Sequence, residues 1–93
     1  MRVDCTFFGP LREPVGEKTV VRELPEGATV ADLVDRLVEE FDGLAPHLVA
    51  EDGGVPANSN VTIDGRNVRQ LDGMDSRLED GATVRFATSV VGG

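Results

Sequence analysis

The feature that most constrains the fold is an amphipathic helix predicted over residues 30–41. Apolar side chains recur there at i, i+3, i+4, i+7, i+8 and i+11, as Val30, Leu33, Val34, Leu37, Val38 and Phe41. This spacing places them along one side of a helix with 3.6 residues per turn. Thr29 is a suitable N-cap, Asp32 stands at the acidic position of a capping box, and Gly43 is the expected left-handed stop. Because such a stripe must be buried against another layer, the helix predicts a sheet beside it.

Two strands are predicted before the helix. Residues 2–8 alternate polar and apolar side chains, which is typical of a strand with one buried face. Val3, Cys5 and Phe7 are expected to point into the core. Residues 18–24 predict a second strand, paired antiparallel with the first.

A hairpin and a final strand are predicted after the helix. Asp-Gly at residues 64–65, between two short alternating runs, favours a type I′ turn, since both central residues of that turn need positive φ. We also expect short helical turns over 44–49, one helical turn over 75–78 and the last strand over 82–87. With the first and last strands in the middle, these elements predict an α+β domain over residues 1–87. A mixed sheet of four or five strands would pack on one main helix.

Composition excludes several classes of function. Ninety-three residues suit one domain with one core. The net charge of −8 argues against nucleic-acid binding, because a phosphate backbone needs a basic face. There is no apolar run near the ~20 residues of a membrane span and no secretory signal, so we expect a cytoplasmic protein that binds no membrane. Cys5 is expected in the core rather than as a nucleophile, and His47 lacks partners for a metal site.

Residues 88–93 are predicted to form a flexible tail that ends in Gly92-Gly93. Glycine has no Cβ, so its backbone passes through slots too narrow for other residues. Such a tail could carry the α-carboxylate of Gly93 into the active site of another protein. Fraying is the alternative interpretation, because chain ends are commonly disordered.

Four stretches together match the pattern of one family. They are Phe7-Phe8-Gly9-Pro10-Leu11-Arg12-Glu13 with Val15-Gly16, Ala28-Thr29-Val30-Ala31-Asp32-Leu33, Asn60-Val61-Thr62-Ile63-Asp64-Gly65-Arg66, and the final Gly92-Gly93. With them the chain resembles the β-grasp, or ubiquitin-like, fold over nearly its whole length. Within that fold it is similar to the small sulfur-carrier subunit of molybdopterin synthase (MoaD) and to the small archaeal modifier proteins.

The resemblance implies chemistry at a carboxylate, with no enzymatic activity and no bound cofactor in the domain itself. A ubiquitin-activating-like adenylyltransferase would use ATP to adenylate Gly93. A sulfur donor would then give a thiocarboxylate for the large subunit of molybdopterin synthase, or an amine would give an isopeptide bond to a lysine of a target protein. Lys18 is a candidate acceptor of this kind. Contacts with partners are expected from Phe8, Val90, Val91 and Gly92.

Three classes of function stay open: a sulfur carrier, a protein modifier, and a non-reactive β-grasp binding domain. The first two share the same activation, so the sequence does not rank them. The third rests on a departure from the family's pattern. Many relatives place Phe-Pro-Pro-Val-Xaa before the diglycine, where this chain has Ala87-Thr88-Ser89-Val90-Val91. Without the prolines the arm is less stiff.

The charged residues predict a dependence of stability on salt. Acidic residues number 17 and basic residues nine, of which only Lys18 is a lysine. This composition is typical of proteins from halophiles, and we expect a halophilic archaeon as the source.

We predict that the melting temperature rises from about 0.1 M to about 1 M potassium chloride, over which the Debye length falls from about 10 to about 3 Å. Screening then weakens the repulsion among the carboxylates. Thermal melts measure the effect, with sorbitol of equal osmolality as the control. A midpoint that stays flat or falls with salt contradicts the prediction.

Overall fold

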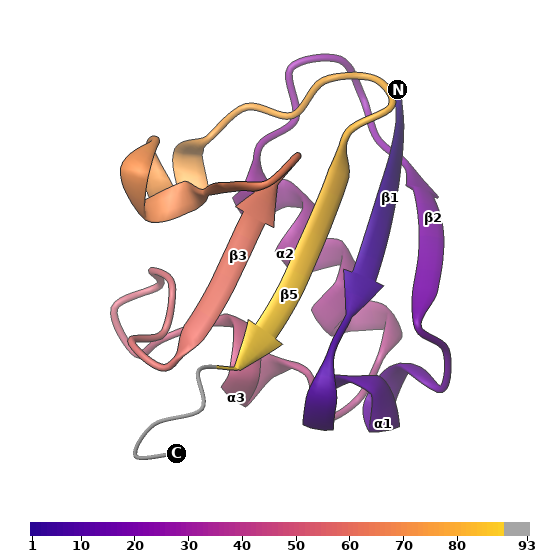
Figure 1. Cartoon of the computed structure of the whole chain (residues 1–93), viewed down its shortest axis with the longest axis vertical. Helices are drawn as coiled ribbons and strands as arrows, with labels where there is room; N and C mark the ends of the chain where they lie inside the picture. The colour runs from indigo at the N-terminus through magenta and orange to yellow at the C-terminus, as the bar shows by residue number, and fades with distance from the viewer. Residues whose placement is uncertain (89–93) are drawn as a thin grey trace.

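The computed structural model describes residues 1–88, which form a five-stranded sheet with its main helix packed on one face (Figure 1). The strands are β1 (Arg2–Phe7), β2 (Thr19–Glu23), β3 (Ser59–Ile63), β4 (Arg66–Asn67) and β5 (Thr83–Thr88). The helices are α1 (Arg12–Val15), α2 (Val30–Glu40) and α3 (Ala45–Leu48), and the 3₁₀ turns are η1 (Gly9–Leu11), η2 (Val68–Gln70) and η3 (Gly73–Asp75). The predicted α+β architecture is confirmed.

The sheet has the order β2-β1-β5-β3-β4, so the first and last strands lie side by side as predicted. They run parallel to each other, whereas every other neighbouring pair is antiparallel. Phe7 lies opposite Phe86 in this register. The two rings stack with their centroids 5.3 Å apart and their planes 12° from parallel. The aromatic pair therefore packs the first strand against the last strand inside the core.

Helix α2 covers one face of the sheet, as its apolar stripe requires. Four residues of the stripe are buried and the last two are half-buried against the core: Val30, Leu33, Val34 and Leu37, then Val38 and Phe41. A fully buried Val or Leu contributes about 1.5–3 kcal/mol before conformational entropy is subtracted. At the start of the helix, the backbone N–H of Asp32 donates to the Thr29 hydroxyl and that of Thr29 donates to the Asp32 carboxylate. The predicted capping box is confirmed.

The end of α2 differs from the expectation. The helix stops at Glu40, and Phe41 is already extended with φ −121°. Gly43 does have positive φ, at +95°, but it lies in the turn beyond the helix. Its prediction as the helix stop was wrong. The helix ends earlier because Phe41 turns back against the core, under the guanidinium of Arg22, which lies 5.6 Å from the ring centroid.

The segment before the last strand also differs from its prediction. The helical turn predicted over residues 75–78 lies instead at Gly73–Asp75. The next residues run beside the start of α2, where the Val30 N–H donates to the Ser76 carbonyl and the Leu78 N–H to the Ala28 carbonyl. A helix there would remove these two bonds to a segment far away in the sequence.

The predicted hairpin is confirmed at the turn between β3 and β4. Asp64 and Gly65 have φ of +49° and +88°, as a type I′ turn requires. The Asp64 carboxylate also accepts a hydrogen bond of 2.9 Å from the Thr83 N–H. The turn is thus tied to the first residue of β5.

Cys5 lies in the core as predicted, with no exposed surface. Burial raises the pKa of its thiol from 9.0 to about 12, because a thiolate would lose its hydration there. The neutral thiol therefore packs as a small apolar group.

This burial predicts a loss of stability in alkali. The folded-state pKa of Cys5 is the higher one, so the contribution is fully present below pH 9 and is lost between pH 9 and about pH 12 as the unfolded chain ionises. At pH 10.5 the free energy of unfolding is lower by on the order of 2 kcal/mol, because it falls by about 1.4 kcal/mol for each pH unit above the unfolded-state pKa. Urea unfolding of wild type and Cys5→Ala at pH 8 and pH 10.5 measures it. Equal pH dependence in both proteins would contradict the assignment to Cys5.

Candidate functional site

The structure describes the base of the predicted tail. Val90, Val91, Gly92 and Gly93 lie outside the described residues, so their predicted roles stay predictions. Strand β5 runs one residue further than expected. Its last residue, Thr88, pairs with a residue of β3. The chain is therefore hydrogen-bonded in the sheet up to the point where residues 89–93 begin.

Both neighbours of β5 hold its end in place. On one side Thr88 lies opposite Ser59 of β3, whose buried hydroxyl donates to the His47 carbonyl of α3. On the other side the Phe8 N–H donates to the Phe86 carbonyl over 3.0 Å. Sequence reasoning missed Ser59, since its partner His47 is 12 residues away and no local pattern joins them. These contacts give the tail a defined starting point.

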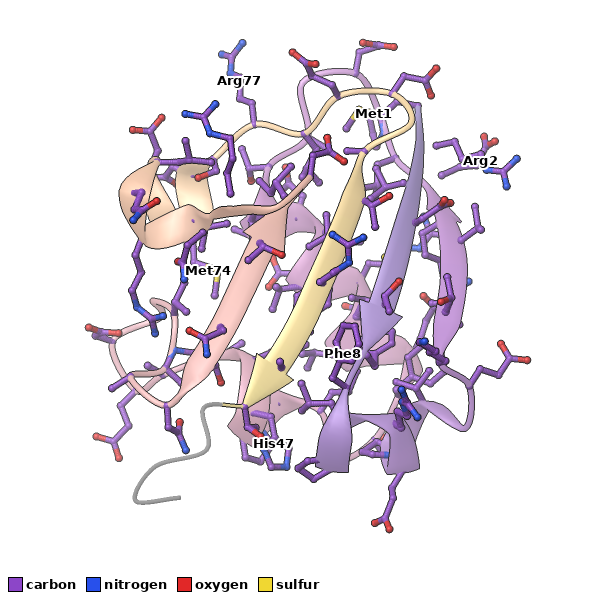
Figure 2. The ribbon with its side chains drawn as sticks, viewed as in Figure 1. Met1, Arg2, Phe8, His47, Met74 and Arg77 are labelled. Atoms are coloured by element: carbon purple, nitrogen blue, oxygen red, sulfur yellow. The ribbon has the colours of Figure 1, made fainter. Side chains whose placement is uncertain are left out.

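Phe8, predicted to contact partners, lies half-buried just beyond β1 and beside the end of β5 (Figure 2). Two cations lie near its ring: the Arg12 guanidinium carbon is 5.9 Å from the centroid and the Lys18 ammonium is 5.8 Å from it. Exposed cation–π contacts of this kind contribute about 0.5–1 kcal/mol each. The fold thus brings together Phe8, which the sequence predicted as a partner contact, and Lys18, which it predicted as a candidate acceptor lysine.

Arg12 is the member of this group that sequence reasoning did not assign to the site. Its Nε donates a 2.9 Å hydrogen bond to the Phe7 carbonyl, which fixes the guanidinium beside the end of β1. Lys18 is exposed, and its carbonyl accepts from the Phe7 N–H over 2.8 Å. The only sequence signal for Arg12 was its place in the first of the four stretches that carry the family resemblance.

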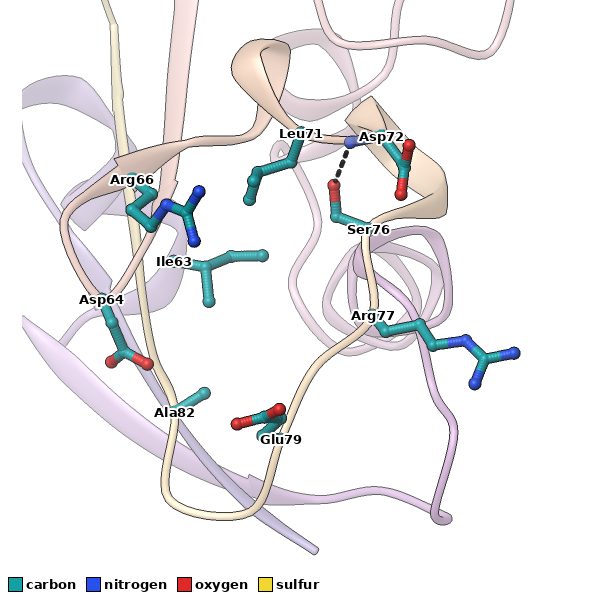
Figure 3. A pocket seen from close by; sticks show the side chains of 9 residues that line it. All are labelled: Ile63, Asp64, Arg66, Leu71, Asp72, Ser76, Arg77, Glu79 and Ala82. Carbon is teal, nitrogen blue, oxygen red and sulfur yellow. Dashed lines mark hydrogen bonds between the residues drawn. The ribbon is translucent and has the colours of Figure 1, made fainter.

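A surface pocket of about 310 Å³ lies elsewhere, between the ends of β3 and η2 and the start of β5 (Figure 3). Ile63 and Leu71 point into it, whereas the side chain of Arg77 points away. Ala82, on its edge, immediately precedes the first residue of β5. The full length of that strand, about 3.3 Å per residue, separates the pocket from Thr88. The pocket is therefore not part of the tail site.

Residues 1–88 contain neither a candidate metal cluster nor a candidate membrane span. No group of three or more His, Cys, Asp or Glu side chains is arranged there to bind a metal ion. No helix in the same range is long and apolar enough to cross a membrane.

Comparisons with known proteins place the chain in a family. A model described as the ThiS family matches residues 5–93. Small archaeal modifier protein 3 of Haloferax volcanii is 42% identical over 93 residues, which is 100% of both chains.

Solved structures agree with this comparison. The solution structure of the HVO 2177 protein of Haloferax volcanii has a TM-score of 0.88 and 42% identity, over 100% of this chain and 87% of that one. The crystal structure of SAMP1 from the same organism has a TM-score of 0.85 and 25% identity, over 100% of both chains. The chain thus has the β-grasp fold of these proteins and is a carrier protein rather than a catalytic enzyme. From the match over residues 5–93 and the end-to-end identity, we conclude that it belongs to the ThiS family.

Proposed function

We propose that the chain is a ubiquitin-like modifier whose Gly93 carboxylate is activated and joined to lysines of other proteins. The observation that carries this proposal is the 42% identity to Small archaeal modifier protein 3 over the whole of both chains. The hydrogen-bonded end of β5 supports it, because a reactive tail needs a defined starting point on the domain.

The chemistry needs activation because a free carboxylate has no good leaving group. In the proposed first step a carboxylate oxygen of Gly93 attacks the α-phosphorus of ATP, and pyrophosphate leaves. A lysine amine of the target then attacks the carbonyl carbon, AMP leaves, and the amine proton passes to solvent. A ubiquitin-activating-like adenylyltransferase supplies the ATP site and the catalytic groups. This chain supplies the carboxylate and the surface that the enzyme recognises.

The second candidate is a sulfur carrier, favoured by the match to the ThiS family model over residues 5–93. A sulfur donor at the oxidation level of sulfide would attack the carbonyl carbon of the same acyl-adenylate, AMP would leave, and Gly93 would become a thiocarboxylate. The large subunit of molybdopterin synthase would be the corresponding partner. Either route consumes ATP, which supports a cytoplasmic location. The acidic composition and the haloarchaeal relative support a halophilic host.

The proposal predicts that deletion of Gly92-Gly93 abolishes ATP-dependent adenylation and leaves the fold intact. The last fully buried residue of β5 is Phe86, which precedes the deleted pair, so the truncated chain keeps every buried residue of that strand. Gly93→Ala should fold equally well and react more slowly, because its methyl group crowds the narrow path to the nucleotide. Pyrophosphate exchange, run beside thermal melts of the three proteins, is the measurement. Adenylation of the truncated protein at the wild-type rate would favour the non-reactive binding domain.

Mass spectrometry of material from the native host separates the two candidates. The modifier predicts diglycine remnants on lysines of other proteins, and the carrier predicts an intact mass in which one oxygen is replaced by sulfur. Lys18→Arg removes the only lysine and keeps the charge. It should therefore abolish lysine-linked self-conjugation and leave conjugation to other proteins unchanged. Absence of both products from the wild type would contradict both candidates.

A further inference from the structure

We propose that Phe8, Arg12 and Lys18, here called the basic–aromatic cluster, form a docking surface for carboxylates on the activating enzyme. This inference rests on the proposed function, since it names how the partner that takes the tail is recognised. The partner is defined by its chemistry: an acidic protein surface that covers an aromatic ring.

Within residues 1–88 the two cations of the cluster form no ion pair, although the surface is rich in carboxylates. The chain carries 17 acidic and nine basic residues. Within residues 1–88 the ion pairs use three arginines, Arg2, Arg22 and Arg36, and neither Arg12 nor Lys18 takes part in one. Among residues 1–88 Arg12 makes one side-chain hydrogen bond, from Nε, which leaves its terminal N–H groups without a partner in that part of the chain.

Contacts within the domain already position the side chains of the cluster. Both cations lie within 6 Å of the centroid of the Phe8 ring, and Arg12 is also fixed by the Phe7 carbonyl. Less side-chain freedom is then lost when a partner binds. A guanidinium held in this way can donate two parallel hydrogen bonds to one carboxylate. The ring beside it offers apolar contact area that would be shielded from water in the complex.

A third cation extends the cluster across the sheet. Arg85 is exposed and lies opposite Thr6, which in turn lies opposite Thr19, the residue after Lys18. These neighbouring strands are about 4.8 Å apart. Like the cluster, Arg85 forms no ion pair within the described part of the chain. The three cations therefore come from the residue before β2, from the start of α1 and from β5.

The cluster lies beside the end of β5. Phe8 is hydrogen-bonded to Phe86, two residues before Thr88, where the described chain ends. An enzyme that takes the following residues into its active site must approach this end of β5 and cover Phe8. Carboxylates on that enzyme would meet the cations and offset the repulsion from the rest of an acidic domain. Contact pairs are also screened less by salt than distant charges.

The test is a comparison of charge variants in pyrophosphate exchange with the adenylyltransferase of the same host. Lys18→Glu and Arg12→Glu should each raise KM about tenfold with kcat unchanged, because they weaken docking and not chemistry. Lys18→Arg keeps the charge and should stay near the wild-type KM. The matched control is Arg77→Glu, which makes the same charge change at the far end of the sheet and should shift KM less than about twofold.

Thermal melts of all variants separate docking from folding. Because Arg12 also bonds to the Phe7 carbonyl, Lys18→Glu is the cleaner variant if Arg12→Glu melts early. Equal KM for Lys18→Glu and Arg77→Glu would overturn the proposal. So would a fall in kcat without a rise in KM.

A second measurement tests, without the enzyme, whether the basic–aromatic cluster binds carboxylates. Hexaglutamate and inorganic phosphate are titrated separately into the ¹⁵N-labelled protein. We expect hexaglutamate to shift the amide signals of Phe8, Arg12 and Lys18 in the wild type, and to leave those of Phe8 and Arg12 unchanged in Lys18→Glu. Shifts with phosphate alone would indicate a phosphate site and overturn the proposal, as would no shift with either probe. If the wild type is not adenylated at all, the proposed function fails, while this titration still decides whether the cluster binds carboxylates.

Discussion

The pairing of β1 with β5 is the interaction on which the rest of the structure depends. It joins the first and last strands in the middle of the sheet and stacks Phe7 on Phe86 beneath α2. The helix stripe needs this continuous apolar face, since it has no other layer to cover. The same pairing places Phe8 beside the end of β5 through the bond to the Phe86 carbonyl. Core and candidate site therefore share one set of backbone contacts.

Four cations of this acidic chain have two different kinds of surroundings. Arg22 and Arg36 tie α2 to the edge of the sheet: Arg22 pairs with Glu40 over 2.7 Å, and Arg36 donates to the Glu23 carbonyl. Such exposed pairs contribute at most about 1 kcal/mol each, so they orient the helix more than they stabilise it. Arg12 and Lys18 lie instead beside Phe8, outside the ion-pair network of the described residues. A surplus of carboxylates thus coexists with a local basic surface.

A carrier of this kind needs little chemistry of its own. The reacting group proposed here is a backbone carboxylate, and the catalytic groups belong to the partner. The domain holds the start of the tail in a defined position, because Thr88 is paired with Ser59 and the Ser59 hydroxyl is hydrogen-bonded to α3. Its single thiol is buried and neutral, so it offers no competing nucleophile. Specificity then has to come from the surface around the start of the tail.

The sequence by itself determined the local elements, and the tertiary structure decided how distant segments meet. Helical periodicity, the Thr29–Asp32 capping box and the Asp64-Gly65 turn depend on neighbours within a few residues, so local patterns predicted them correctly. The end of α2, the extended path of residues 76–78 and the pairing of Thr88 depend on contacts with remote strands and helices. The same holds for the meeting of Arg12 and Lys18 at Phe8. These features arise from packing in three dimensions, which a pattern along the chain does not encode.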